Sequence, residues 1–311
     1  MKRWLLVLLA VLIAAAMLGC APQGSDKPAE TARPTATAVP KDLIEEDTDA
    51  MGNEVEAVDT AELRIVSTAP SATEILFALG LGDKIVGIDV SSTYPPETAD
   101  IEVVGDFNGF DIEKVIALEP TVVFAGNGLQ HEDIARLEEA GLKVVASEAT
   151  YYEDIAKSIT LIGTTVGKEA EAAALNEQIA QTEAAVKEKA QTLSAKPSVY
   201  YVMYGNWTSG EGSFINSVID MAGGTCVTAG TESEWLEYPM EQLVVDDPNI
   251  LIVSQYIAEA DLTAAVGYAD LTAVKDKQYY FINPDIIERP GPRIGEALQA
   301  IQADIETFLG A

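Results

Sequence analysis

Apolar and polar positions form a pattern that occurs twice along the chain. Residues 111–128 and residues 239–256 each contain a short amphipathic helical stretch, an acidic residue followed by proline, and a continuous apolar run. Such a run is typical of a strand buried on both faces of a parallel sheet. A fainter match relates residues 71–80 to residues 214–223. The chain is therefore predicted to contain two similar α/β lobes with a ligand cleft between them.

Strands and helices are predicted to alternate in both lobes. In the first lobe we expect strands at 64–68, 84–88, 102–104, 121–125 and 143–147, and helices at 71–80, 111–118 and 129–140. In the second lobe we expect strands at 199–204, 250–254 and 279–282, and helices at 213–222, 239–246, 268–275 and 292–309. The fold class is therefore α/β, with a central, mostly parallel sheet in each lobe.

One long helix is predicted to join the two lobes. Residues 168–192 are rich in Ala, Glu and Lys and contain no Pro or Gly. An apolar stripe follows this segment at helical spacing, formed by Leu175, Ile179, Val186, Ala190 and Leu193. At ~1.5 Å per residue the helix would be about 37 Å long, enough to run along both lobes.

The N-terminus has the features of an export signal. Lys2 and Arg3 precede an apolar stretch at residues 4–16, which is shorter than the ~20 residues that a membrane-spanning helix needs. The stretch ends in Met17-Leu18-Gly19-Cys20, which is close to a bacterial lipobox. We predict that residues 1–19 are a lipoprotein signal peptide and that Cys20 is lipidated; the alternative is an uncleaved membrane anchor. Both place the rest of the chain outside the cytoplasm, attached to a membrane.

Sequence composition predicts a tether and sets the boundaries of the two lobes. Regularly spaced prolines and then an acidic run predict that residues 20–61 are a disordered tether. The first lobe is assigned to residues 62–166, the joining helix and its ends to residues 167–195, and the second lobe to residues 196–311.

The net charge and the small numbers of cysteine and histidine residues exclude several functions. The net charge is −31, and becomes −33 when residues 1–19 are removed, because they contain Lys2 and Arg3 and no acid. Such a surface repels nucleic acid, so no nucleic-acid partner is expected. Cys226 is the only cysteine besides Cys20, so the mature chain has no intrachain disulfide. The single histidine, His131, leaves no convincing metal site or catalytic triad, and no catalytic residue is predicted.

Residues 62–309 resemble the substrate-binding proteins of ABC importers for cobalamin, ferric siderophores and haem. The motifs that carry the resemblance are Pro-Ser-Ala-Thr-Glu-Ile-Leu at 70–76, Tyr94-Pro95-Pro96, Val104-Gly105, Leu118-Glu119-Pro120, Ala222-Gly223-Gly224 and Arg289-Pro290-Gly291-Pro292-Arg293. The resemblance implies two α/β lobes joined by a long helix, a chelate bound in the cleft, and delivery to a membrane permease with its ATPase. We expect a monomer and no resident cofactor.

Glu74 has two interpretations that do not exclude each other. Ser71 and Glu74 have the spacing of a capping box, in which the glutamate would accept from the backbone N–H of Ser71. The resemblance implies instead that Glu74 pairs with permease arginines. In the second lobe Ser217 occupies the pseudo-symmetric position, where many relatives carry a second glutamate. Asp220 and Glu211 are the candidates to substitute for it, and Asp220 is our second docking candidate.

Loops after the predicted strands supply the candidate ligand-binding residues, because ligands of α/β sheets bind there. Aromatic side chains in loops indicate binding more strongly than those in strands, whose alternative role is core packing. His131 has the alternative of an ordinary helix-start residue, and Arg289 that of fixing its own loop. The candidates are Tyr94, Gln130, His131, Tyr204, Trp207, Trp235, Tyr238, Tyr256 and Arg289, with Asn127 beside them.

A corrinoid is the favoured ligand. Anionic ferric chelates generally need several basic groups to offset their charge, and Arg289 is the only evident candidate. Haem needs an axial ligand, for which His131, Tyr94 or Tyr204 is available. Ferric-siderophore and haem binding remain alternatives within the same class. A membrane-tethered sensor or scaffold without transport is the rival from another class, and an enzyme is the most distant.

Overall fold

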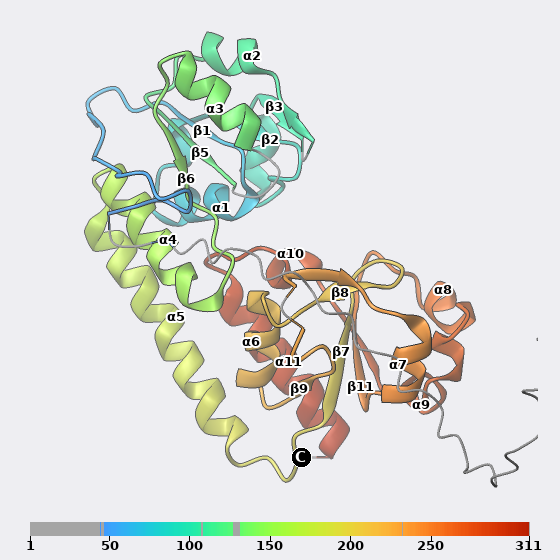
Figure 1. The fold of residues 1–311 in the computed structure, drawn as a ribbon. Helices are drawn as coiled ribbons and strands as arrows, with labels where there is room; N and C mark the ends of the chain where they lie inside the picture. The colour runs from blue at the N-terminus through green and yellow to red at the C-terminus, as the bar shows by residue number, and fades with distance from the viewer. Residues whose placement is uncertain (1–43, 45–46, 107, 127–130, 232, 311) are drawn as a thin grey trace, which may run out of the picture. The chain divides into compact units, whose positions relative to one another are not determined.

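A computed structural model describes residues 44, 47–106, 108–126, 131–231 and 233–310. Within these residues two α/β lobes are joined by one long helix, as predicted (Figure 1). No helix in this part of the chain is long and apolar enough to cross a membrane. The predicted signal peptide, Cys20, Asn127 and Gln130 lie outside the described residues.

The first lobe contains a six-stranded sheet in the order β4-β3-β2-β1-β5-β6. All neighbouring strands are parallel except β3 and β4. The strands are β1 (Ile65–Ser67), β2 (Ile85–Asp89), β3 (Val103–Asp106), β4 (Gly109–Phe110), β5 (Val122–Ala125) and β6 (Val144–Ala146). The α-helices are α1 (Pro70–Ala78), α2 (Ile112–Ala117), α3 (His131–Glu139) and α4 (Tyr152–Thr165). The central strands β1 and β5 are wholly buried, which explains their continuous apolar sequences.

The second lobe contains a smaller parallel sheet in the order β12-β11-β7-β9 and a separate antiparallel pair, β8 and β10. The strands are β7 (Ser198–Val202), β8 (Trp207–Ser209), β9 (Thr225–Cys226), β10 (Trp235–Glu237), β11 (Ile250–Ser254) and β12 (Tyr279–Ile282). The α-helices are α6 (Phe214–Met221), α7 (Met240–Asp246), α8 (Glu259–Ala264), α9 (Thr272–Lys275), α10 (Pro284–Ile287) and α11 (Ile294–Leu309).

The repeated sequence pattern produces the same local structure in both lobes. α2 leads into β5, and α7 leads into β11. The acidic residue that ends each helix, Glu119 or Asp247, has a positive φ of 47° or 38°. A left-handed residue is a common way to end a helix, and the proline that follows cannot continue it. Asp247 also accepts hydrogen bonds from the backbone N–H and hydroxyl of Thr272, at 2.8 and 2.6 Å.

The long helix α5 (Glu169–Ala190) connects the lobes. It packs against α4 of the first lobe and against α6 and α11 of the second. Ile179 and Val186, two members of the predicted stripe, are buried. The side-chain amide of Gln302 on α11 donates to the backbone carbonyl of Val186 at 2.7 Å. With 22 residues the helix is about 33 Å long, close to the predicted length.

A segment predicted to be part of the disordered tether is instead packed on the first lobe. Residues 47–58, which we call the strap, run along β6 at the edge of the sheet. The backbone N–H of Ala50 donates to the carbonyl of Ala146 at 2.8 Å, and the N–H of Ala146 donates to the carboxylate of Asp49 at 3.1 Å. Asp49 is 1% exposed. The strap therefore covers a sheet edge that would otherwise present unpaired backbone groups.

Candidate ligand cleft

A cleft of about 730 Å³ lies between the two lobes. The first lobe contributes segments that follow β1, β2 and β6, and the second contributes residues after β7 and β11, the start of β10, and the segment 284–290. These are mainly the carboxyl ends of parallel strands, where open α/β sheets bind ligands. The volume falls within the range of small-molecule sites.

Four of the predicted ligand residues line this cleft: Trp207, Trp235, Tyr256 and Arg289. Trp207 and Trp235 are brought together because β8 and β10 pair in an antiparallel ribbon. Tyr256 approaches from the loop after β11. Three aromatic side chains on the second-lobe wall provide a surface on which a flat ligand can stack.

The other described candidates lie elsewhere. Tyr238 is 1% exposed, packs 5.8 Å from the ring of Tyr200, and donates a 2.6 Å hydrogen bond to Asp246, so it belongs to the core. Tyr204 is 76% exposed and is not among the described residues that line the cleft. Tyr94 stacks on the guanidinium of Arg293, with 3.9 Å between the guanidinium carbon and the ring centroid. His131 is exposed at the start of α3, as expected for an ordinary helix-start residue.

The cleft lining contains carboxylates that sequence analysis missed. Asp89 and Glu148 come from the first lobe, and Glu234, Asp285 and Glu288 from the second. The pKa of Glu148 is raised from its ordinary value of 4.5 to about 7, mainly by burial and also by the nearby charges of Glu234 and Asp89, against a hydrogen bond from Ser71 that lowers it. Burial is also the main cause of the raised pKa of Asp89, Glu234 and Glu288.

Arg289 is engaged by the protein itself. Its Nη1 donates to Glu74 Oε1 at 2.9 Å. Its Nη2 lies within 3.0 Å of three acceptors, which are the carbonyl of Ser91, the hydroxyl of Thr93 and the carboxylate of Asp285. This arrangement favours the alternative in which Arg289 fixes its own loop over one in which it neutralises an anionic ligand.

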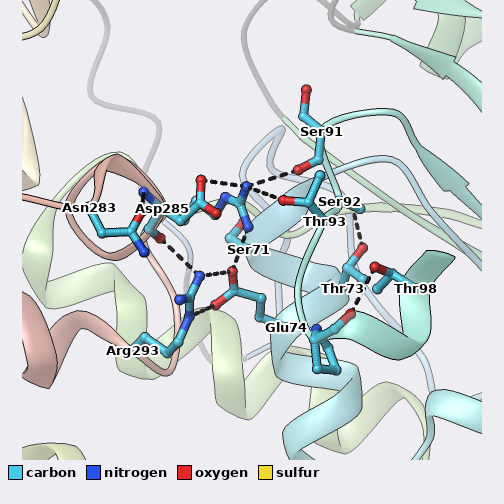
Figure 2. A network of polar contacts seen from close by, with 12 residues as sticks. Ser71, Thr73, Glu74, Ser91, Ser92, Thr93, Thr98, Asn283, Asp285 and Arg293 are labelled. Atoms are coloured by element: carbon cyan, nitrogen blue, oxygen red, sulfur yellow. Dashed lines mark hydrogen bonds and ion pairs between the residues drawn. The ribbon is translucent and has the colours of Figure 1, made fainter. Parts of the chain in front are cut away.

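Glu74 is the centre of an ion-pair cluster that joins the lobes. Figure 2 shows Glu74 on α1 of the first lobe facing Arg293, which precedes α11 of the second. Arg293 donates to both carboxylate oxygens of Glu74, at 2.8 and 2.6 Å, and Arg289 adds the contact described above. The side chain of Glu74 is 1% exposed and those of Arg289 and Arg293 are 11% and 12% exposed. We call Glu74, Arg289 and Arg293 the Glu74 cluster.

The capping-box prediction for Ser71 and Glu74 is wrong. Pro70 occupies the first helical position of α1, so the N-cap is Ala69 and no side chain caps the helix. Ser71 therefore lies inside the first turn, where its hydroxyl donates to Glu148 at 3.3 Å. The structure also does not present Glu74 on an exposed surface. Asp220, the second docking candidate, has a side chain that is 69% exposed and pairs with Lys196 at 3.1 Å.

Comparison with known proteins identifies the family. The sequence model of the periplasmic binding protein family matches residues 65–286. The chain belongs to this family. An uncharacterised ABC transporter substrate-binding lipoprotein, YvrC of Bacillus subtilis, is 29% identical over 99% of both chains. The vitamin B12-binding protein of Vibrio cholerae is 30% identical over 76% of this chain and 87% of its own.

Solved structures agree with the fold. The haem-binding protein RhuT of Roseiflexus sp. RS-1 matches 79% of this chain and 99% of its own, with a TM-score of 0.72 and 25% identity. The vitamin B12-binding protein BtuF of Vibrio cholerae matches 79% and 97%, with a TM-score of 0.69 and 26% identity. The resemblance noted from the sequence is thus confirmed: this is a substrate-binding protein of an ABC importer. Members of the family are exported binding proteins that act with a permease and an ATPase.

We expect Glu148→Gln to stabilise this binding protein at high pH only. Because the pKa of Glu148 is raised to about 7 in the folded state, protonated Glu148 favours folding, and this contribution is lost as pH rises from 4.5 through 7. Glutamine keeps a neutral side chain of the same shape. Urea denaturation should show a gain of roughly 1–3 kcal/mol at pH 8 and little change at pH 4. An equal effect at both pH values would contradict this assignment; Glu237→Gln, at the exposed end of β10, is the control.

Proposed function

We propose that this protein captures a corrinoid in its interlobe cleft and delivers it to a membrane permease powered by an ATPase. The observation that carries the proposal is the composition of the cleft wall. Trp207, Trp235 and Tyr256 offer stacking surfaces, while the one basic side chain among the described lining residues, Arg289, is already ion-paired. A large, nearly uncharged macrocycle fits such a wall better than an anionic iron chelate. The similar proteins that bear the name of vitamin B12 support the same ligand.

The proposal also covers location and role. Cys20 would carry the lipid that holds the exported protein at the membrane, since the preceding residues resemble a lipobox and a similar protein is named a lipoprotein. The protein would have no catalytic role. A tethered sensor would bind the same ligand without transport. Corrinoid uptake by vesicles that contain the permease and ATPase separates these two roles.

Haem binding is the second candidate, because structural neighbours bind haem and Tyr256 lines the cleft. A tyrosine binds ferric iron as the phenolate. Desolvation in the cleft and the carboxylate of Asp285 raise the pKa of Tyr256, which disfavours that form. Haem propionates would also lie among the cleft carboxylates. These features rank haem below a corrinoid.

We expect cyanocobalamin to bind with one-to-one stoichiometry and with little dependence on salt. Trp207→Ala should weaken binding at least tenfold, about 1.4 kcal/mol, because an aromatic surface is lost from the complex. Tyr204→Ala is the matched control, since Tyr204 is close in sequence and 76% exposed but outside the cleft lining. Isothermal titration calorimetry measures the affinities, and thermal melting should show little change for either variant. Absence of cyanocobalamin binding together with tight haem binding would replace the first candidate by the second.

A further inference from the structure

The cleft brings carboxylates from both lobes to face one ligand volume. Asp89 and Glu148 lie on the first-lobe wall, and Glu234, Asp285 and Glu288 on the second. With five carboxylates and one guanidinium, the formal charge of the described lining is −4 when every acid is ionised. The guanidinium is shared with Glu74, which lies outside the lining, so it offsets this charge only in part.

Three of these acids are held in place by the protein. Asp89 accepts from the backbone N–H of Ser91 at 2.9 Å and from the hydroxyl of Ser92. Glu288 accepts from the hydroxyl of Tyr201 at 2.5 Å. Asp285 pairs with Arg289 at 2.8 Å. An ionised carboxylate has about four acceptor positions, so each of these groups keeps acceptor capacity beyond its present partner.

Glu148 and Glu234 line the cleft from opposite lobes. Both side chains border the same ligand volume, and repulsion between their like charges adds to the effect of burial on the raised pKa of Glu148. Glu148 accepts a long hydrogen bond of 3.3 Å from Ser71. Glu234 directly precedes Trp235, one of the aromatic residues of the cleft wall. A ligand that brings N–H donors between these two acids would relieve the repulsion, whereas a ligand carboxylate would add to it.

We propose that Glu148 and Glu234, one on each cleft wall, make the cleft select corrinoids whose peripheral side chains are amides and reject those whose side chains are free carboxylates. This inference rests on the proposed corrinoid function and adds a specificity to it. Peripheral primary amides can donate to the acids of both walls, while the flat ring stacks on the aromatic side chains. The same acids disfavour other anionic chelates by like-charge repulsion.

The test compares two corrinoids that share one ring system and differ in peripheral charge. Dicyanocobinamide carries amides, and dicyanocobyrinic acid carries free carboxylates. Calorimetry at pH 8 should show at least a hundredfold preference of the wild-type protein for dicyanocobinamide. The double variant Glu148→Gln, Glu234→Gln keeps the shape of both side chains and removes their charge, so it should bind dicyanocobyrinic acid at least tenfold more tightly than the wild type does.

Glu237→Gln serves as the matched control, because Glu237 lies on the same strand as Trp235 but is exposed and outside the cleft lining. It should leave the preference unchanged. Equal affinity of the wild-type protein for the two corrinoids would overturn the inference and leave the proposed function standing. An unchanged preference in a folded double variant would also overturn it. Failure of the wild-type protein to bind either corrinoid would overturn both the inference and the proposed function.

Discussion

Replacing Glu74 by glutamine should destabilise the folded protein by about 3–5 kcal/mol, the typical cost of removing one partner of a buried ion pair. The change would leave Arg289 and Arg293, which are only 11% and 12% exposed, without their shared carboxylate. Because the cluster joins α1 to the segment before α11, ligand affinity should fall as well. Urea denaturation measures the first effect and calorimetry with cyanocobalamin the second.

Asp220→Asn is the control for this prediction. Asp220 pairs with Lys196 at 3.1 Å, but its side chain is 69% exposed, so its loss should change stability by no more than about 0.5 kcal/mol. Unchanged stability of Glu74→Gln would contradict the buried cluster. That result would instead favour an exposed Glu74 carboxylate that can pair with permease arginines, as the family resemblance implies. In the present arrangement, a permease could reach Glu74 only by displacing arginines of the same chain.

Asp49→Ala should release the strap from the first lobe and lower stability by about 3 kcal/mol. The carboxylate of Asp49 accepts from the backbone N–H groups of Met51, Asn53 and Ala146, at 3.0, 2.9 and 3.1 Å. Hydrogen bonds to a charged group contribute about 1.5–3 kcal/mol each, but the net loss is smaller than their sum because water solvates the donors of the released strap. Denaturant unfolding gives the stability change, and limited proteolysis should show new cleavage within residues 47–58.

Asp59→Ala is the control for the Asp49→Ala prediction. Asp59 accepts one hydrogen bond from the backbone N–H of Ala61 at 2.9 Å, and it is exposed. Its removal should leave both stability and the proteolytic pattern close to those of the wild type. A strap that stays resistant to protease in Asp49→Ala would show that apolar contacts, such as those of the buried Ala50, suffice to hold it.

The architecture was predictable because its determinants are local and repeated. Continuous apolar runs identified β5 and β11, and an apolar stripe along an Ala-rich segment identified α5. The helix α4 was missed. Its buried positions Ile155, Ile159 and Ile162 have helical spacing, but several Ser and Thr residues lower its helix propensity. The strap was missed because its apolar residues are few and lie among acids, which is also the composition of a disordered segment.

The site was only partly predictable. Four residues expected in loops after parallel strands line the cleft, although two of them lie in the antiparallel pair β8 and β10: Trp207, Trp235, Tyr256 and Arg289. Sequence analysis did not find Glu148 or Glu234, because 50 acidic residues are spread along the chain and no local pattern marks those that face the cleft. The Ser71–Glu74 spacing matched a capping box, but Pro70 moved the helix start. The partners of Glu74 lie more than 200 residues away, where only the tertiary structure shows them.

The strap also sets how far the binding protein can travel from the bilayer. With the lipid that we propose on Cys20, the segment between the anchor and the packed body ends no later than residue 47, instead of at residue 61 as predicted. At ~3.5 Å per residue, covalent geometry limits its length to about 95 Å instead of about 145 Å. The half-sphere that the anchored protein can explore shrinks to roughly a third of its volume, as the cube of the length of that segment. If Cys20 carries that lipid, the dozen residues docked on one sheet edge keep the ligand-loaded protein nearer to its transporter.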